Sequence, residues 1–267
     1  MVCIAAIYDI DGVIRDVSQS YRKALADTVE TFTARYLEAS WRPEQTDIDR
    51  LKAEGVWNND WEGSRELIYR AWERQGRQRE GLKLDFEEIV AFFQSRYRGS
   101  GDAPEQWDGY INNEPLLVQP NYFAALSAAD LAWGFFSGAT RSSVAFVLQR
   151  RLQLTDPVVH AMEDGPEKPD PSGLLRVLAE LETRLQSRFD AVVYSGDTTG
   201  DMETLLNARQ KDASRQWKAV GIVPPHLWND EGRKAEFQQL LRDRGANLVV
   251  QKVTELTPMR VKELFAS

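Results

Sequence analysis

The chain of 267 residues has one cysteine, two histidines and fewer basic than acidic side chains. Cys3 stands alone, which excludes an intramolecular disulfide, and its place in an apolar run predicts a small buried side chain. With 33 Lys and Arg against 41 Asp and Glu, the net charge of -8 argues against broad binding to nucleic acid or an anionic membrane. His160 and His226 lie in no zinc spacing and no Ser–His or Cys–His arrangement, so we expect structural or surface roles.

The sequence also lacks a long hydrophobic run. No apolar stretch approaches the ~18 residues that cross a membrane. No basic region precedes the short apolar run at the N-terminus, which is unlike a signal peptide, so a cytoplasmic location is the expectation. Hydrophobic content of 42% and charged content of 28% fit a globular protein with a sizeable core and a second, smaller module.

Two aspartates stand directly behind the N-terminal apolar run, in the segment 8–13 (YDIDGV). Asp9 and Asp11 can share one site, where one attacks an electrophile or binds a metal and the other carries a proton. Gly12 allows a sharp turn and a close approach of the backbone to a ligand. An Asp-Gly turn without chemistry is the alternative for this segment alone. A calcium loop is excluded, because Ser18 stands where the EF-hand pattern needs Glu.

Apolar spacing predicts helices between residues 18 and 97, followed by strands that alternate with helices. The intervening segment 99–120 is rich in Gly, Pro and Asn and is typical of a linker. The alternation favours βαβ units and a parallel sheet, and therefore an α/β fold. Strands are expected at 2–8, 131–136, 158–162, 189–194, 219–223 and 247–250, and helices at 142–151, at 171–187 and between the last two strands.

Three later segments add polar side chains close to predicted strand ends. Ser137, at a strand-to-helix turn with free backbone N–H groups, suits a phosphoryl oxygen, although an ordinary helix cap gives the same pattern. Lys168 lies in a loop stiffened by two prolines, and a solvated surface lysine is its alternative. Asp197 and Asp201 are four residues apart, so both can face one point and suit Mg²⁺, or else lie at the positive end of a helix.

Taken in order, DxDGV, a strand ending in Ser-Gly, Lys-Pro and GDxxxD are the motif set of the haloacid dehalogenase-like (HAD) superfamily, which the chain resembles over nearly its full length. The helical segment inserted after the first motif resembles the C1-type cap of subfamily I phosphatases, in a poorly characterised hypothetical branch. The resemblance implies an α/β, Rossmann-like three-layer core with a mainly parallel sheet, formed by residues 1–16 and 119–267. It also implies an inserted α-helical cap at 17–118.

The resemblance further implies roles for the acidic motif residues. Asp9 would be the nucleophile that becomes an aspartyl-phosphate, and Asp11 would protonate the leaving oxygen and then activate water. Mg²⁺ would be held by the Asp9 carboxylate, the Asp11 backbone carbonyl and Asp197. Asp201 would hold the waters of the metal.

The remaining motif residues would bind the phosphoryl group. By the same resemblance, Ser137 and Gly138 would hold its oxygens, and Lys168 would neutralise both Asp9 and the phosphate. Phosphoryl transfer needs mainly positioning and positive charge around these oxygens, so the residue types fit the chemistry.

Asp11 also narrows the reaction within the superfamily. At its position, ion-pumping relatives carry Thr and phosphonate-cleaving relatives carry Ala, and haloacid dehalogenases lack the second aspartate. The sequence therefore predicts a Mg²⁺-dependent phosphatase acting on a small phosphorylated metabolite. A phosphomutase of the β-phosphoglucomutase type would use the same residues and stays open as the alternative. A non-catalytic binding or regulatory protein on the same fold is the third possibility.

Substrate choice is expected from the inserted helices. In C1-capped relatives the loop after the first cap helices faces the active site, and Asn58, Asn59 and Asp60 match that location. Their polar side chains would suit a hydroxylated leaving group. The alternative is that the asparagines cap a helix. Arg141, four residues past Ser137, would reach a substrate anion or the cap, or else be solvated.

Overall fold

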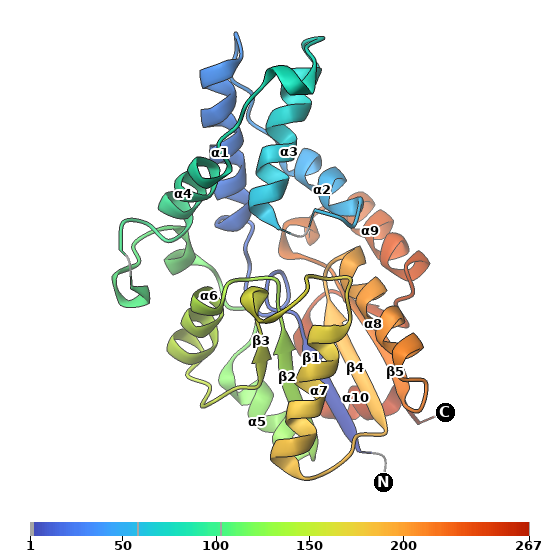
Figure 1. The fold of residues 1–267 in the computed structure, drawn as a ribbon. Helices are drawn as coiled ribbons and strands as arrows, with labels where there is room; N and C mark the ends of the chain where they lie inside the picture. The colour runs from blue at the N-terminus through green and yellow to red at the C-terminus, as the bar shows by residue number, and fades with distance from the viewer. Residues whose placement is uncertain (1–2, 58, 102, 267) are drawn as a thin grey trace. The chain divides into compact units, whose positions relative to one another are not determined.

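The computed structural model describes residues 3–57, 59–101 and 103–266. The chain divides into two compact units, one formed by Met1–Asp16 with Pro115–Ser267 and the other by Val17–Glu114 (Figure 1). The second unit is thus an insertion into the first. Its role as a cap stays a prediction.

The first unit is built on one sheet of six parallel strands, in the order β3-β2-β1-β4-β5-β6. This confirms the predicted α/β, Rossmann-like fold. The central strand β1 lies between β2 and β4, so the chain order reverses there, which is where such sheets bind ligands. The strands are β1 (Ile4–Tyr8), β2 (Leu131–Phe136), β3 (Val159–His160), β4 (Ala191–Gly196), β5 (Gln216–Ile222) and β6 (Leu248–Val250).

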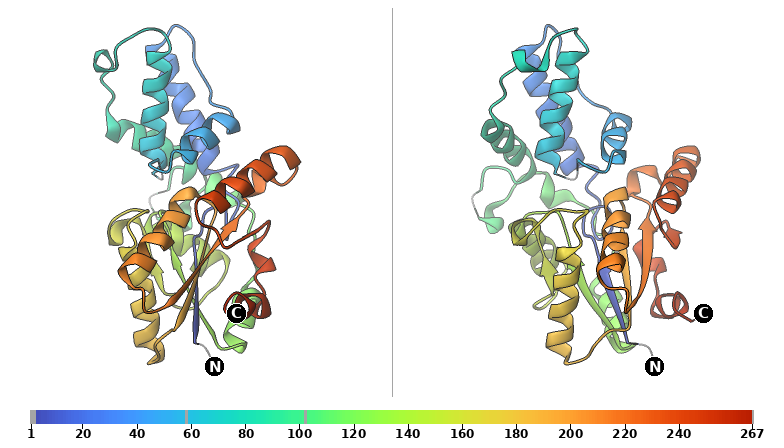
Figure 2. Two further views of the ribbon diagram at one scale, coloured as in Figure 1. Left: turned by 90° about the vertical axis from the view of Figure 1, so that its right-hand side faces the viewer. Right: turned by 45° about the vertical axis from the view of Figure 1, so that its right-hand side comes forward.

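Helices cover both faces of this sheet, with α7 and α8 on one side and α5 and α10 on the other (Figure 2). They are α5 (Pro120–Ala128), α6 (Arg141–Ala145), α7 (Ser172–Leu185), α8 (Thr199–Lys211), α9 (Glu231–Asp243) and α10 (Pro258–Glu263). A π-helical turn η4 (Phe146–Arg151) continues α6, and short 3-10 turns are η5 (Met162–Asp164), η6 (Pro225–Leu227) and η7 (Val253–Glu255).

Strand β1 is buried at every position, as expected of a continuous apolar run in a parallel sheet. Its alternate residues Ala5 and Ile7 belong to the core formed with α7, α8 and α9. Tyr8 points to the other face, where its ring meets the edges of Tyr122 and Phe123 from α5. The strand that carries Asp9 at its end is therefore fixed by packing on both sides.

The second unit is helical. Its helices are α1 (Tyr21–Tyr36), α2 (Gln45–Ala53), α3 (Asp60–Glu73) and α4 (Phe86–Tyr97), with 3-10 turns η1 (Arg79–Gly81), η2 (Pro104–Gln106) and η3 (Tyr110–Asn113). Helix α1 packs against α3 and α4. Its buried Tyr21 stacks on Tyr97 with ring centroids 4.0 Å apart, which ties the first and last helices together.

Several local expectations need adjustment. The strand at 131–136 is confirmed, whereas that expected at 2–8 begins at Ile4, because Cys3 precedes the first paired residue of β1; residues 1–2 lie outside the described residues. The helix expected at 142–151 changes to a π-helical turn at Phe146. Burial of Cys3 is wrong: the residue precedes β1 and is exposed, with its sulfur 4.0 Å from the Ser187 hydroxyl. Within the described residues, no helix has the length and apolar character to cross a membrane.

Candidate active site

The predicted site residues of the first unit gather at the carboxyl ends of three neighbouring strands. Tyr8, the last residue of β1, pairs with Phe135 of β2 and with Ser195 of β4. Asp9 comes next and donates its backbone N–H to the Ser195 carbonyl at 2.8 Å. Ser137 follows Phe135 by two residues and Asp197 follows Ser195 by two. Sheet register thus brings Asp9, Ser137 and Asp197 to one edge of the sheet.

Asp9 is buried and carries an ion pair to Lys168, whose Nζ lies 2.9 Å from its Oδ1. The pKa of Asp9 is raised to about 7: burial is the largest cause, the Lys168 ammonium opposes it, and the carboxylates of Asp201 and Asp11 act in the same direction as burial. A buried carboxylate beside one ammonium is suited to attack, provided that positive charge keeps it ionised.

Lys168 is shared between two aspartates. Its Nζ lies 2.9 Å from Asp9 and 2.7 Å from Asp201, and the side chain is only 6% exposed. Burial alone would lower the pKa of Lys168, but Asp201 and Asp9 together raise it above its usual value. Asn207 of α8 donates to the Pro169 carbonyl at 3.0 Å and so fastens the lysine loop. The surface alternative for Lys168 is therefore wrong.

Asp201 accepts four hydrogen bonds and is fully buried. Lys168 and the Tyr194 hydroxyl donate to its Oδ1 at 2.7 and 2.8 Å. The backbone and hydroxyl of Thr198 donate to Oδ2 at 3.0 and 2.6 Å. Burial raises the pKa of Asp201, but the Lys168 ammonium and these hydrogen bonds lower it by more, so that the net pKa lies below the usual value. Because both oxygens are saturated with donors, the geometry favours holding Lys168 over direct contact with an ion.

The residues fit a cation site. One carboxylate oxygen from each of Asp9, Asp197 and Asp201 lies within 4.8 Å of the others, and Lys168 pairs with two of these aspartates, Asp9 and Asp201. Gly12 has φ +75°, and a Cβ there would stand 2.0 Å from Oδ2 of Asp197. The glycine is thus required for space and for conformation, because Asp197 occupies the volume of a side chain.

The strand end at Ser137 is less open than its predicted role suggests. Its backbone N–H donates to the His160 carbonyl at 3.0 Å, and its Oγ accepts from Ala139 at 3.1 Å. Gly138 is exposed, and a Cβ there would meet nothing within 4 Å. The hydroxyl proton of Ser137 and the exposed backbone of Gly138 are therefore the groups to which the predicted binding of phosphoryl oxygens would fall. His160 is buried and its ring meets that of Phe136 edge to face, so a structural role stays the expectation for it.

Arg141 lies on the first turn of α6, with its side chain 59% exposed and paired with Asp164. Its backbone N–H donates to Glu163 at 2.8 Å. These contacts fasten the turn after Ser137 to η5. The surroundings of Arg141 match the alternative expected from the sequence, a largely solvated arginine.

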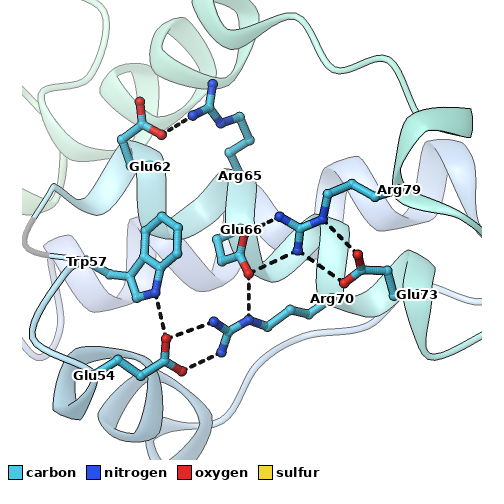
Figure 3. Close-up of polar contacts among 8 residues, drawn as sticks. All are labelled: Glu54, Trp57, Glu62, Arg65, Glu66, Arg70, Glu73 and Arg79. Carbon is cyan, nitrogen blue, oxygen red and sulfur yellow. Dashed lines mark hydrogen bonds and ion pairs between the residues drawn. The ribbon is translucent and has the colours of Figure 1, made fainter.

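In the second unit, the segment after α2 is held by ion pairs (Figure 3). Glu54 receives both guanidinium ends of Arg70 at 2.7 and 2.8 Å and the indole N–H of Trp57 at 2.7 Å. Arg70 also donates to Glu66 at 2.8 Å, and Glu66 in turn receives Arg79. The segment that precedes α3 is therefore anchored to that helix.

The three residues predicted to select substrate have different surroundings. Asn59 caps α3, accepting from the backbone of Trp61 at 2.9 Å and of Glu62 at 3.4 Å. Asp60 pairs with Lys52 at 2.9 Å. Asn58 lies outside the described residues. The helix-capping alternative thus holds for Asn59, and specificity stays a prediction.

Sequence reasoning missed two residues that touch the acidic groups. Tyr194 donates to Asp201 from inside β4, and Arg15 contacts Asp11 with Nε 2.6 Å from Oδ1. In the sequence, Tyr194 is indistinguishable from the other apolar residues of its predicted strand. Arg15 is four residues past Asp11, but that spacing signals contact only in a helix, and this segment is a loop.

Comparison with known proteins adds a family and several relatives. The sequence matches the profile of the haloacid dehalogenase-like hydrolases over residues 5–209. The imidazoleglycerol-phosphate dehydratase of Phytophthora nicotianae is 29% identical over 251 residues, which are 92% of this chain and 50% of that protein. The chain spans about half the length of this curated relative.

Solved structures share the fold. A phosphonoacetaldehyde hydrolase-like protein from Oleispira antarctica is similar with TM-score 0.68 and 18% identity, covering 98% of this chain and 92% of that one. Phosphatase Tt82 from Thermococcus thioreducens is similar with TM-score 0.59 and 19% identity, covering 89% of this chain and 98% of that one. CbbY from Rhodobacter sphaeroides, solved with phosphate, is similar with TM-score 0.57 and 15% identity, covering 96% of this chain and 96% of that one. The family profile spans most of the chain and includes Asp9, Lys168 and Asp201, and the chain therefore belongs to the haloacid dehalogenase-like hydrolases.

Proposed function

We propose that the protein is a Mg²⁺-dependent phosphatase that hydrolyses a small phosphorylated metabolite through an aspartyl-phosphate on Asp9. The observation that carries the proposal is the buried Asp9 carboxylate, 2.9 Å from the Lys168 ammonium at the end of the central strand. Support comes from fold neighbours, one named as a phosphatase and another solved with phosphate.

The proposed reaction has two steps. Asp9 attacks phosphorus, the bond from phosphorus to the leaving oxygen breaks, and Asp11 gives that oxygen its proton. Asp11 then takes a proton from water, whose oxygen bonds to phosphorus as the Asp9–phosphorus bond breaks, releasing inorganic phosphate. Lys168 offsets the negative charge of Asp9 and of the phosphoryl oxygens throughout.

Asp9, Asp197 and the backbone carbonyl of Asp11 would hold the Mg²⁺. This small oxygen-preferring cation usually takes one or two carboxylates and keeps several waters, so it does not need Asp201 as a direct ligand. When bound, it supplies positive charge beside the phosphoryl group. Ser137 and Gly138 are proposed to bind the remaining phosphoryl oxygens, and Arg141 to contribute to substrate binding.

A panel of phosphorylated metabolites, assayed by release of free phosphate, tests the function. Phosphate release by the wild type but not by Asp9→Asn supports hydrolysis by this site. The panel should include imidazoleglycerol phosphate, for which the curated relative is named. An isomerised product that needs a bisphosphate primer would instead show a phosphomutase, and absence of turnover across the panel would favour a binding protein.

Activity is expected to require Mg²⁺ and to be inhibited by excess Ca²⁺, because Ca²⁺ takes more ligands at longer distances and would displace Asp9. Asp197→Ala should raise the Mg²⁺ concentration for half-maximal activity by at least about tenfold, the smallest cost usually seen even for residues behind a ligand. Titration of chelated enzyme with each cation measures both effects. Full activity after exhaustive chelation would contradict the metal requirement.

Residues 17–118 are proposed to select the substrate. Asp60→Asn is expected to lower kcat/KM for the best metabolite more than for p-nitrophenyl phosphate, whose leaving group uses few specific contacts. Asn59→Ala is the control: losing the α3 cap should cost about 1 kcal/mol and affect both substrates alike. Equal losses for Asp60→Asn would assign its Lys52 pair to the stability of the helical unit alone.

A further inference from the structure

We propose that Arg15 is a positioning residue that holds the Asp11 carboxylate for its proton transfers. This inference rests on the proposed function, in which Asp11 is the acid and base. It concerns a residue outside the four motifs and assigns it a task in the reaction.

Arg15 and Asp11 form a close ion pair in which the arginine is buried and the aspartate is partly exposed. Arg15 Nε lies 2.6 Å from Asp11 Oδ1, with the arginine side chain 0% exposed and the aspartate 27% exposed. A carboxylate that is partly open to solvent has several staggered orientations, and a buried partner selects one of them. The pair therefore fixes where the proton of Asp11 is given and taken.

The backbone between the two residues is also fixed. Ile14 donates to the Ile10 carbonyl at 2.8 Å, and Gly12 donates to the Arg15 carbonyl at 2.9 Å. Arg15 itself forms an antiparallel bridge with Leu116, on the chain segment that returns from the insertion. The guanidinium thus extends from an anchored loop, and its position relative to Asp11 is set before substrate binds.

The two catalytic aspartates have separate cationic partners. Asp9 pairs with Lys168, and Asp11 pairs with Arg15. Burying a guanidinium is costly, and replacing a buried ion pair by apolar side chains is often neutral for stability. A positioning role accounts for an arginine here better than a gain in stability does.

A double-mutant cycle tests the inference, with p-nitrophenyl phosphate and Mg²⁺. Arg15→Met is expected to lower kcat by about tenfold to a hundredfold, the scale of a misplaced catalytic group, with a much smaller change in KM. Arg15→Lys should recover part of the loss and also serves if Arg15→Met folds poorly. Arg184→Met is the matched control, since Arg184 pairs with Glu180 at the same spacing on the exposed face of α7 and should keep full activity.

The decisive result is the double variant. If Arg15 acts through Asp11, then Asp11→Asn with Arg15→Met is no slower than Asp11→Asn alone. A burst of p-nitrophenol close to the enzyme concentration is also expected for Arg15→Met, because a misplaced base slows hydrolysis of the aspartyl-phosphate more than its formation.

Other outcomes distinguish a failure of the Arg15 role from a failure of the proposed function. Additive losses, or a gain in turnover on removing Arg15, would overturn the positioning role while leaving the phosphatase intact. Full activity of Asp11→Asn would overturn the proposed acid and base, and with it the role of Arg15.

Discussion

The Asp9→Asn enzyme is expected to lose at least about a thousandfold in turnover while keeping its fold. An amide does not form the aspartyl-phosphate, and a thousandfold corresponds to about 4 kcal/mol of barrier, a modest estimate for loss of a covalent step. Asn has the shape of Asp, and Lys168 keeps its 2.7 Å contact with Asp201, so the buried ammonium stays paired.

Steady-state release of phosphate and thermal unfolding, measured on the same preparation, check this prediction. Asp190→Asn is the control, because Asp190 is exposed at the opposite end of the sheet and should keep full activity. Turnover of Asp9→Asn above a thousandth of wild type would contradict the nucleophile role.

Lys168→Met is expected to be inactive and to lower the free energy of unfolding by about 3–5 kcal/mol, the usual cost of removing one partner from a buried ion pair. The reason is that Asp9 and Asp201 are both buried and would lose their shared counter-charge. Mg²⁺ should stabilise Lys168→Met more than wild type, since a cation replaces part of the missing charge.

Denaturant unfolding with and without Mg²⁺ measures both effects. Lys168→Arg, which keeps the charge, should lose less stability than Lys168→Met, and Lys262→Met, at an exposed position, should change little. A stable Lys168→Met that gains nothing from Mg²⁺ would show that the two aspartates do not need a cation between them.

The α/β fold could be predicted from sequence because each buried strand is a short apolar run. The run at 131–136 matches β2, and those at 219–223 and 247–250 recover most of β5 and β6. Errors fall at the ends, where apolar character stops deciding structure. Cys3 is apolar in type but lies before the first pairing of β1, and it is exposed for that reason.

The residues of the site that belong to local sequence motifs could be predicted, whereas their partners outside the motifs could not. The Lys168 position between Asp9 and Asp201 follows the motif order, but the saturation of Asp201 depends on Tyr194 and Thr198 meeting it in three dimensions. Likewise, the pairing of Arg15 with Asp11 depends on a loop path that no periodicity encodes. Such contacts between individual side chains are not visible in the apolar periodicity of a single sequence.

The insertion begins and ends at one place in the first unit. Asp16 donates to the Pro115 carbonyl at 2.8 Å, and Leu117 donates to Ile14 at 2.8 Å. Ninety-eight intervening residues, Val17–Glu114, are thus bridged by two backbone hydrogen bonds. The sheet unit needs nothing from the length of that segment, because its ends are already joined in space. Helices in that segment could therefore be lengthened, shortened or exchanged without parting the strand and loop that it interrupts.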